Sequence, residues 1–165
     1  AGPSLFRFGF RFFTPKQYNN LVYYGRGPGE NYPDRKDASF VGLYRQRVEE
    51  QFYPYIRPQE NGTKTDIRWW QLLDHRGSGM LVDSDSLFSA SALHYSQELL
   101  DDGPVKHNRH SRDLEEENFT QCSIDLLQMG VACINAWGAL PEKQYMLPYG
   151  DYSFTCSILD TNKIY

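Results

Sequence analysis

The sequence has little cysteine. Its three cysteines, Cys122, Cys133 and Cys156, include no C-x-x-C pair, so neither a disulfide framework nor a zinc site is indicated. The 165 residues contain no apolar run long enough to cross a membrane and no charged start followed by an apolar segment, a pattern that predicts neither a transmembrane helix nor a signal peptide. We expect a single domain over residues 1–165, without a membrane partner, that is long enough to bury its own core.

An excess of positive charge is also missing. The net charge is −4 and the pI is about 5.5, and the basic side chains are scattered, which argues against a nucleic-acid partner. Catalytic signatures are absent as well, since no serine stands in a G-x-S-x-G context and no pair of histidines forms H-E-x-x-H. The residues themselves indicate no cofactor and no metal.

What the sequence does contain is alternation of apolar and polar residues, which predicts half-buried strands. Four phenylalanines share one face of the first expected strand, at residues 5–13: Phe6, Phe8, Phe10 and Phe12. Further strands are expected at residues 20–24, 39–48, 65–73, 80–83, 87–95, 119–127 and 152–158, with one short helix at 97–101. The apolar residues of 39–48 fit a helical face about as well, and an irregular strand is favoured there. Several short strands with almost no helix predict an all-β fold, an antiparallel β-sandwich.

Two polar, proline-framed loops, at residues 24–35 and 54–62, interrupt these strands. Their glycines and prolines forbid a helix or a central strand, and a rigid scaffold commonly holds such loops over a ligand. Glu30 and Glu60 are the glutamates of these loops. A retaining sugar hydrolase needs two carboxylates about 5 Å apart. The alternative is that each loop is closed by its own ion pairs, such as Glu60 with Arg57.

A third loop, at residues 128–138, is bracketed by glycines and carries Trp137 near its end. A tryptophan at a loop tip is a surface on which a sugar ring can stack, and the alternative is plain core packing. His94 lies on an expected strand beside Tyr95. It is a candidate ligand-facing group, and the alternative is a buried histidine whose hydrogen bonds go to a neighbour.

Several motifs occur in a fixed order along the chain. They are GPGENYPDR at residues 27–35, YPYIRPQENG at 53–62, FSASALHYS at 88–96, Met-Gly at 129–130 and Trp-Gly at 137–138. By these motifs the chain resembles the C-terminal small-chain domain of family 2 glycoside hydrolases, the β-galactosidases of the large bacterial type. The likeness covers residues 5–158, which is nearly the whole chain.

The resemblance implies a large antiparallel sandwich of the galactose mutarotase type, of which this chain holds the C-terminal part. It also implies a neighbouring (β/α)8 barrel that carries the catalytic glutamates. Neither glutamate motif occurs here, so the chain alone is expected to be inactive on lactose. By position in the motif, Trp137 is the family's sugar platform in the active site, although residues 134–136 differ from the acidic residues common in relatives. The candidate contacts to a β-galactoside are Trp137, Asn135, Glu30, His94 and Glu60.

Two other functions stay open at this point. One is a stand-alone carbohydrate-binding sandwich that uses Trp137 and Trp70. The other is a mutarotase-like epimerase, with His94 and either Glu30 or Glu60 across the anomeric carbon of a sugar. The family's domain has strands before the first one expected here, so we expect unprotected edges and an apolar face to cause self-association. The resemblance leaves both the cytoplasm and the bacterial periplasm open as compartments.

Overall fold

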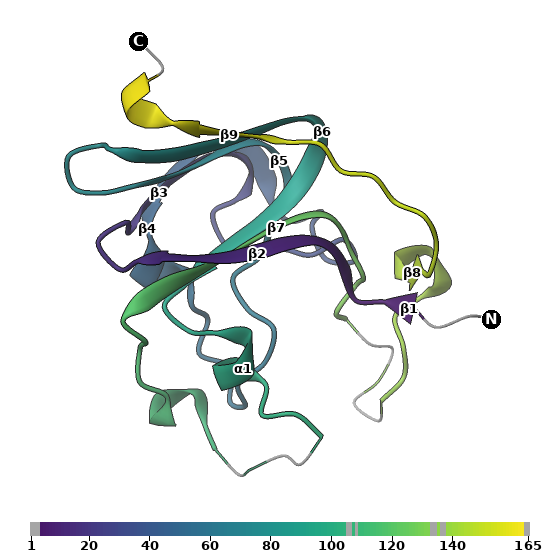
Figure 1. Ribbon diagram of the computed structural model, residues 1–165. Helices are drawn as coiled ribbons and strands as arrows, with labels where there is room; N and C mark the ends of the chain where they lie inside the picture. The colour runs from purple at the N-terminus through teal and green to yellow at the C-terminus, as the bar shows by residue number, and fades with distance from the viewer. Residues whose placement is uncertain (1–3, 105–106, 108, 133–134, 136–137, 164–165) are drawn as a thin grey trace.

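The structure is a computed structural model that describes residues 4–104, 107, 109–132, 135 and 138–163 (Figure 1). The large sheet is antiparallel and has seven strands in the order β2-β7-β6-β5-β3-β4, with β9 paired to β6; β1 and β8 form a separate two-stranded sheet. The strands are β1 (Ser4–Leu5), β2 (Arg7–Pro15), β3 (Asn20–Gly27), β4 (Phe40–Arg47), β5 (Lys64–Leu73), β6 (Gly79–Leu93), β7 (Phe119–Gln128), β8 (Leu147–Pro148) and β9 (Ser157–Asp160).

Among the described residues, helical structure is limited to single turns. The α-helix α1 (Gln97–Leu100) begins at Ser96, whose side chain accepts a hydrogen bond from the backbone N–H of Leu99, as expected for a serine at this position. Among the residues that the structure describes, no helix is both long and apolar enough to cross a membrane. The short 3-10 turns are Val48–Gln51, Ser111–Asp113, Lys143–Tyr145 and Thr161–Lys163.

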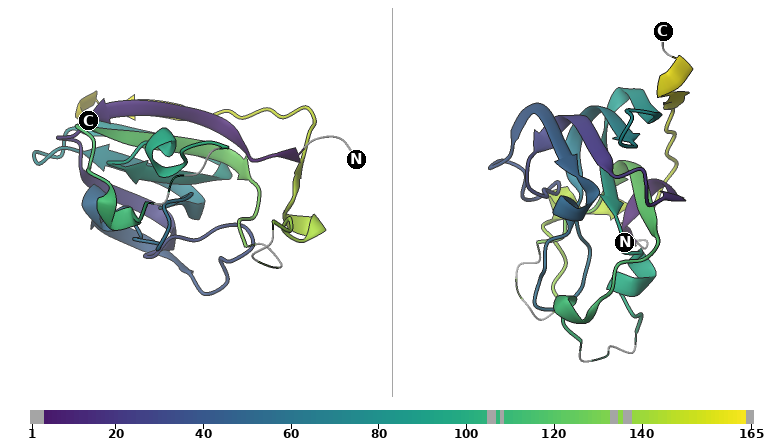
Figure 2. Two further views of the ribbon diagram at one scale, coloured as in Figure 1. Left: turned by 90° about the horizontal axis from the view of Figure 1, so that it is seen from below. Right: turned by 90° about the vertical axis from the view of Figure 1, so that its left-hand side faces the viewer.

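The core lies against one face of the large sheet. Inward-facing residues of β3, β5, β6 and β7 form one buried cluster, among them Tyr23, Trp70 and Phe88, and Phe10 and Phe12 of β2 pack against it. Figure 2 shows β2 and β7 on one side of the molecule and β3 and β4 on the other. The prediction of an all-β, antiparallel, sandwich-like fold is confirmed, whereas the likeness to galactose mutarotase stays a prediction.

The strand β6 corrects one expectation. It runs without a break for 15 residues, where two strands were expected on either side of a polar stretch. Its first part pairs with β9 and its last part with β7, while β5 pairs with both parts. Asp83 pairs with Trp69 of β5 and with Ser157 of β9, so the strand continues into the polar stretch, because a ladder of hydrogen bonds does not depend on apolar side chains.

Two further boundaries differ from the expected ones. Residues 152–156 are not in a strand, although Phe154 and Cys156 still pack against the core. Phe6 lies at a bend before β2 and is 40% exposed, so the phenylalanine face does not extend to it. The register of β2 shifts between Phe8 and Gly9, and such an irregularity is invisible to a strict alternation.

Candidate functional site

The three loops singled out in the sequence meet at one cavity of about 440 Å³. The first loop contributes Arg35, and the second contributes Tyr55, Gln59 and Glu60. The third loop contributes residues 129–132 and 138, on either side of the positions that the structure does not describe. We call this space the three-loop cavity. Its lining is completed by Phe6, Met129, Gly130, Val131, Ala132, Gly138, Ala139, Leu140 and Pro141. An apolar floor with a few polar groups at the rim is typical of small-molecule sites.

Glu30 ties the first loop to the second. Its carboxylate accepts hydrogen bonds from the Arg35 guanidinium at 2.5 Å, from the backbone N–H of Gly62 at 2.8 Å and from the hydroxyl of Tyr55. The side chain is only 8% exposed. Burial, followed by the hydrogen bond to Glu30, raises the pKa of Tyr55. This carboxylate therefore fixes the relative position of two loops that are far apart in the sequence.

Glu60 lines the cavity and forms an ion pair with Arg7. Its carboxylate accepts hydrogen bonds from Arg7 Nη2 at 2.7 Å, from Thr63 Oγ1 at 3.1 Å and from Gln128 Nε2 at 3.2 Å. Arg7 lies at the start of β2, 53 residues away in sequence. The local alternative, a pair of Glu60 with Arg57, is wrong, because the charge of Glu60 is neutralised by Arg7. Arg7 lies on β2, a terminal strand of the large sheet.

Arg7 also pairs with Asp125 of β7, Nη1 to Oδ2, at 3.1 Å. The Asp125 side chain is only 3% exposed. Burial raises the pKa of this carboxyl to about 6, Arg7 lowers it in part, and the nearby charge of Glu60 raises it again. The Arg7 guanidinium therefore lies between two carboxylates. That of Asp125 is buried, and Glu60 lines the cavity.

The pKa of Tyr32 responds to the charges of both Glu30 and Glu60. This tyrosine is completely buried, and its pKa is raised well above its ordinary value by burial first and then by the charges of Glu60 and Glu30. The structure therefore brings both glutamates to the surroundings of one phenol. Each carboxylate is already paired with an arginine, an arrangement that suits an anchor better than the free acid and nucleophile of a hydrolytic pair.

Asn31 supports the first loop, a structural role that the sequence did not predict. Its side-chain amide donates to the carbonyls of Arg26 and Gly29, each at 3.1 Å, and its oxygen accepts from the backbone N–H of Thr65 at 3.0 Å. Its own N–H donates to Thr63 O at 2.8 Å. A fully buried asparagine with these partners supports the glycine-rich turn from within, and its place between Glu30 and Tyr32 in the motif was the available signal.

Of the candidate residues Glu30, Glu60 and His94, only Glu60 lines the three-loop cavity, so His94 does not face it. His94 is 2% exposed, and its Nδ1 lies 3.2 Å from both the carbonyl oxygen of Phe119 and the Oγ1 of Thr120. Burial lowers the pKa of this imidazole. This geometry agrees with the alternative of a buried histidine held by its neighbours, and a sugar contact for His94 stays a prediction.

The remaining predicted residues belong to the third loop. Asn135 is exposed, while Trp137 lies outside the described residues. Val131 and Gly138, on either side of Trp137 in the chain, both line the three-loop cavity. The loop thus borders the cavity at both of its described ends, and the sugar contacts of Asn135 and Trp137 stay predictions.

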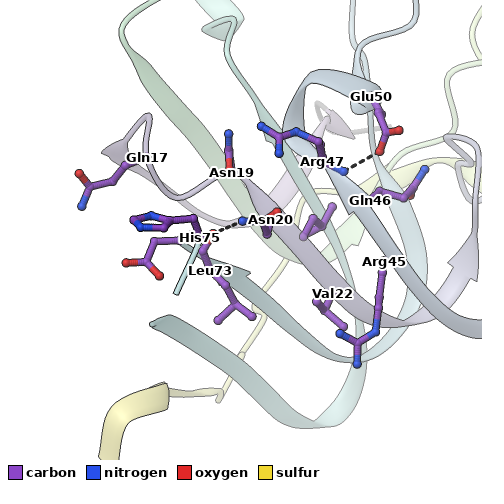
Figure 3. A pocket seen from close by; sticks show the side chains of 12 residues that line it. Gln17, Asn19, Asn20, Val22, Arg45, Gln46, Arg47, Glu50, Leu73 and His75 are labelled. Atoms are coloured by element: carbon purple, nitrogen blue, oxygen red, sulfur yellow. Dashed lines mark hydrogen bonds between the residues drawn. The ribbon is translucent and has the colours of Figure 1, made fainter. Parts of the chain in front are cut away.

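A larger cavity, of about 740 Å³, lies at the opposite end of β3, β4 and β5 (Figure 3). Polar side chains dominate its lining, including Asn19, Arg45 and His75, and some of them bond locally, as Asn20 does to Leu73 O at 3.5 Å. None of the candidate contacts that the structure describes, Glu30, Glu60, His94 and Asn135, lines it. Within the described part of the chain, no group of three or more His, Cys, Asp or Glu side chains could hold a metal ion.

The fold and the site define an all-β domain in which three loops form a small cavity. Both charged and apolar side chains line this cavity. A family model described as beta galactosidase small chain matches residues 2–158. The chain therefore belongs to the β-galactosidase small-chain family.

Proteins named beta-galactosidase are similar to this chain over most of its length. That of Priestia megaterium is 34% identical over 153 residues, which are 93% of this chain and 14% of that protein. That of Lactobacillus delbrueckii subsp. bulgaricus is 34% identical over 85% of this chain and 13% of its own length, and that of Vibrio cholerae is 32% identical over 94% and 14%. The chain thus spans about one seventh of these relatives.

Proposed function

We propose that this chain is the non-catalytic C-terminal domain of a retaining β-galactosidase, that it completes the galactoside-binding pocket, and that it packs against a (β/α)8 catalytic barrel. The observation that carries the proposal is the meeting of three motif-bearing loops at one cavity. The relatives support it, since each is named a beta-galactosidase and is about seven times longer than the matched segment.

In this proposal Trp137 forms the platform under the galactose ring, and Asn135 contributes a polar contact beside it. An indole buries the C–H face of a pyranose and can donate one hydrogen bond through its N–H. Glu60 lines the cavity, and Arg7 neutralises its charge. Glu30 acts through the loops that it joins, because its carboxylate is nearly buried and has an arginine partner.

Galactose titration followed by tryptophan fluorescence tests this function. The chain alone is expected to show no saturable change up to millimolar sugar, where binding is worth only about 4 kcal/mol, because the other walls of the pocket belong to the barrel. In the intact enzyme, Trp137→Ala is expected to raise KM for a galactoside about tenfold, equivalent to about 1.4 kcal/mol. Trp69→Phe, on β5, serves as the control and should leave KM unchanged.

The two alternatives have distinct outcomes in the same experiments. Saturable quenching of the isolated chain that disappears in Trp137→Ala would establish a stand-alone carbohydrate-binding domain instead. An epimerase would speed the change in optical rotation of fresh α-galactose. The burial of His94 disfavours this activity, since a general base must come within hydrogen-bond reach of the proton that it removes.

We also propose that the isolated chain self-associates. The terminal strands of the large sheet, β2 and β4, each pair on one side only within the described residues. Two side chains near the β4 edge are strongly exposed, Phe40 at 78% and Leu43 at 58%. Open edges beside apolar side chains favour edge-to-edge pairing. Light scattering is expected to show a mass above 19.2 kDa that rises with concentration, and a constant monomer mass at high concentration would contradict it.

A further inference from the structure

Asp34 connects the first loop to the third. It is the aspartate of the GPGENYPDR motif, and its Oδ2 accepts a hydrogen bond from the backbone N–H of Ala132 at 2.6 Å. These residues are 98 positions apart. No ion pair of Asp34 occurs among the described residues, and its Oδ1 is buried without a partner there. The carboxylate therefore acts on the third loop as a charged acceptor for a backbone amide, which is a stronger contact than a neutral one.

The third loop is also fixed on its other sides. The N–H of Met129 donates to Phe6 O and the N–H of Gly130 donates to Tyr145 O, both at 2.8 Å. A Cβ atom added at Gly130 would collide with the Asp34 carboxylate and would lie 2.9 Å from Tyr145 Cβ. Only glycine lets the loop pass between Asp34 and Tyr145 at this point.

We propose that Asp34 is a positioning residue, whose carboxylate fixes the start of the third loop at Ala132. This inference rests on the proposed function only for the sugar contact of Trp137. The inference also explains why two motifs occur in one sequence. Asp34 of the first motif lies so close to Gly130 of the Met-Gly motif that a side chain at position 130 would collide with it.

Amide hydrogen exchange resolved by NMR tests the contact in the chain itself. Asp34→Ala removes the acceptor, and we expect the amide of Ala132 to exchange about tenfold faster. Asp34→Asn keeps an oxygen that can accept the bond, so we expect it to restore most of the protection. The amide of Cys122, in the middle of β7 and paired on both sides, is the control and should not change in either variant.

Unchanged exchange at Ala132 in Asp34→Ala would overturn the proposal, as would equal exchange rates in the alanine and asparagine variants. If Asp34→Ala fails to fold, Gly130→Ala decides, because its new methyl group must separate the carboxylate from the loop. Faster exchange at Ala132 then supports the proposal, and an unchanged rate overturns it.

Kinetics of the intact enzyme separate this inference from the proposed function. If both are right, Asp34→Ala raises KM for a galactoside as Trp137→Ala does, and Asp34→Asn recovers it. If exchange at Ala132 accelerates while neither Asp34→Ala nor Trp137→Ala changes KM, the positioning role of Asp34 stands, and the sugar contact assigned to Trp137 is wrong.

Discussion

Replacing Arg7 by alanine is expected to lower the free energy of unfolding by about 3–5 kcal/mol, the usual loss when one partner of a buried ion pair is removed. Arg7 donates to Glu60 at 2.7 Å and to Asp125 at 3.1 Å. Its loss leaves two carboxylates close together, and the Asp125 side chain is 3% exposed. Urea unfolding at neutral pH measures the change.

Arg11→Ala is the matched control. Arg11 lies on the same strand, β2, and pairs with Glu98, whose side chain is 66% exposed. Pairs of this kind contribute less than about 1 kcal/mol. Equal losses of unfolding free energy in Arg7→Ala and Arg11→Ala would contradict this prediction. They would show that the ion pairs of Arg7 with Glu60 and Asp125 stabilise the fold no more than an exposed pair does.

Much of the fold could be predicted because one face of each strand is buried. Alternation located β5 and β7, and it placed Cys122 and Ile124 inside the core. The strands β3 and β4 were expected only as a short strand and as an irregular one. The prediction failed where the backbone departs from strict pairing. In β5 the pairing is irregular on either side of Ile67, and Ile67, Trp70 and Leu72 are all buried, although strict alternation would put Ile67 on the face opposite Trp70 and Leu72. A bulge shifts the side chains of a strand by one position, and no local pattern announces it.

The site was harder to predict because its contacts are long-range. The sequence showed three loops rich in glycine, proline and polar groups, but their meeting at one cavity depends on the order of strands in the sheet. Within-loop pairing was the simplest expectation for Glu60, and the structure pairs it with Arg7 instead. Partners 53 residues apart can be recognised only once β2 and the second loop have been placed in space.

The second large effect is a dependence of stability on pH that originates at Asp125. Burial raises the pKa of this carboxyl to about 6 in the folded chain, above its ordinary value of 3.8. The folded state therefore holds the proton more tightly than the unfolded state does. The contribution of Asp125 to stability is fully present while the carboxyl is protonated, below about pH 4, and is lost as the pH rises to about 6. The change amounts to roughly 3 kcal/mol, at 1.36 kcal/mol for each pH unit between the two values.

Urea unfolding of the wild type and of Asp125→Asn across pH 4–7 isolates this contribution. Carboxyls whose pKa the fold lowers, such as Asp66 and Glu49, give the opposite slope, but they occur in both proteins and cancel in the difference. The wild type minus variant difference is expected to fall up to about pH 6 and to be flat above it, whereas a flat or rising difference from pH 4 would refute the assignment. In Arg7→Ala the fall should extend to higher pH, because the charge that holds the pKa of Asp125 down is gone.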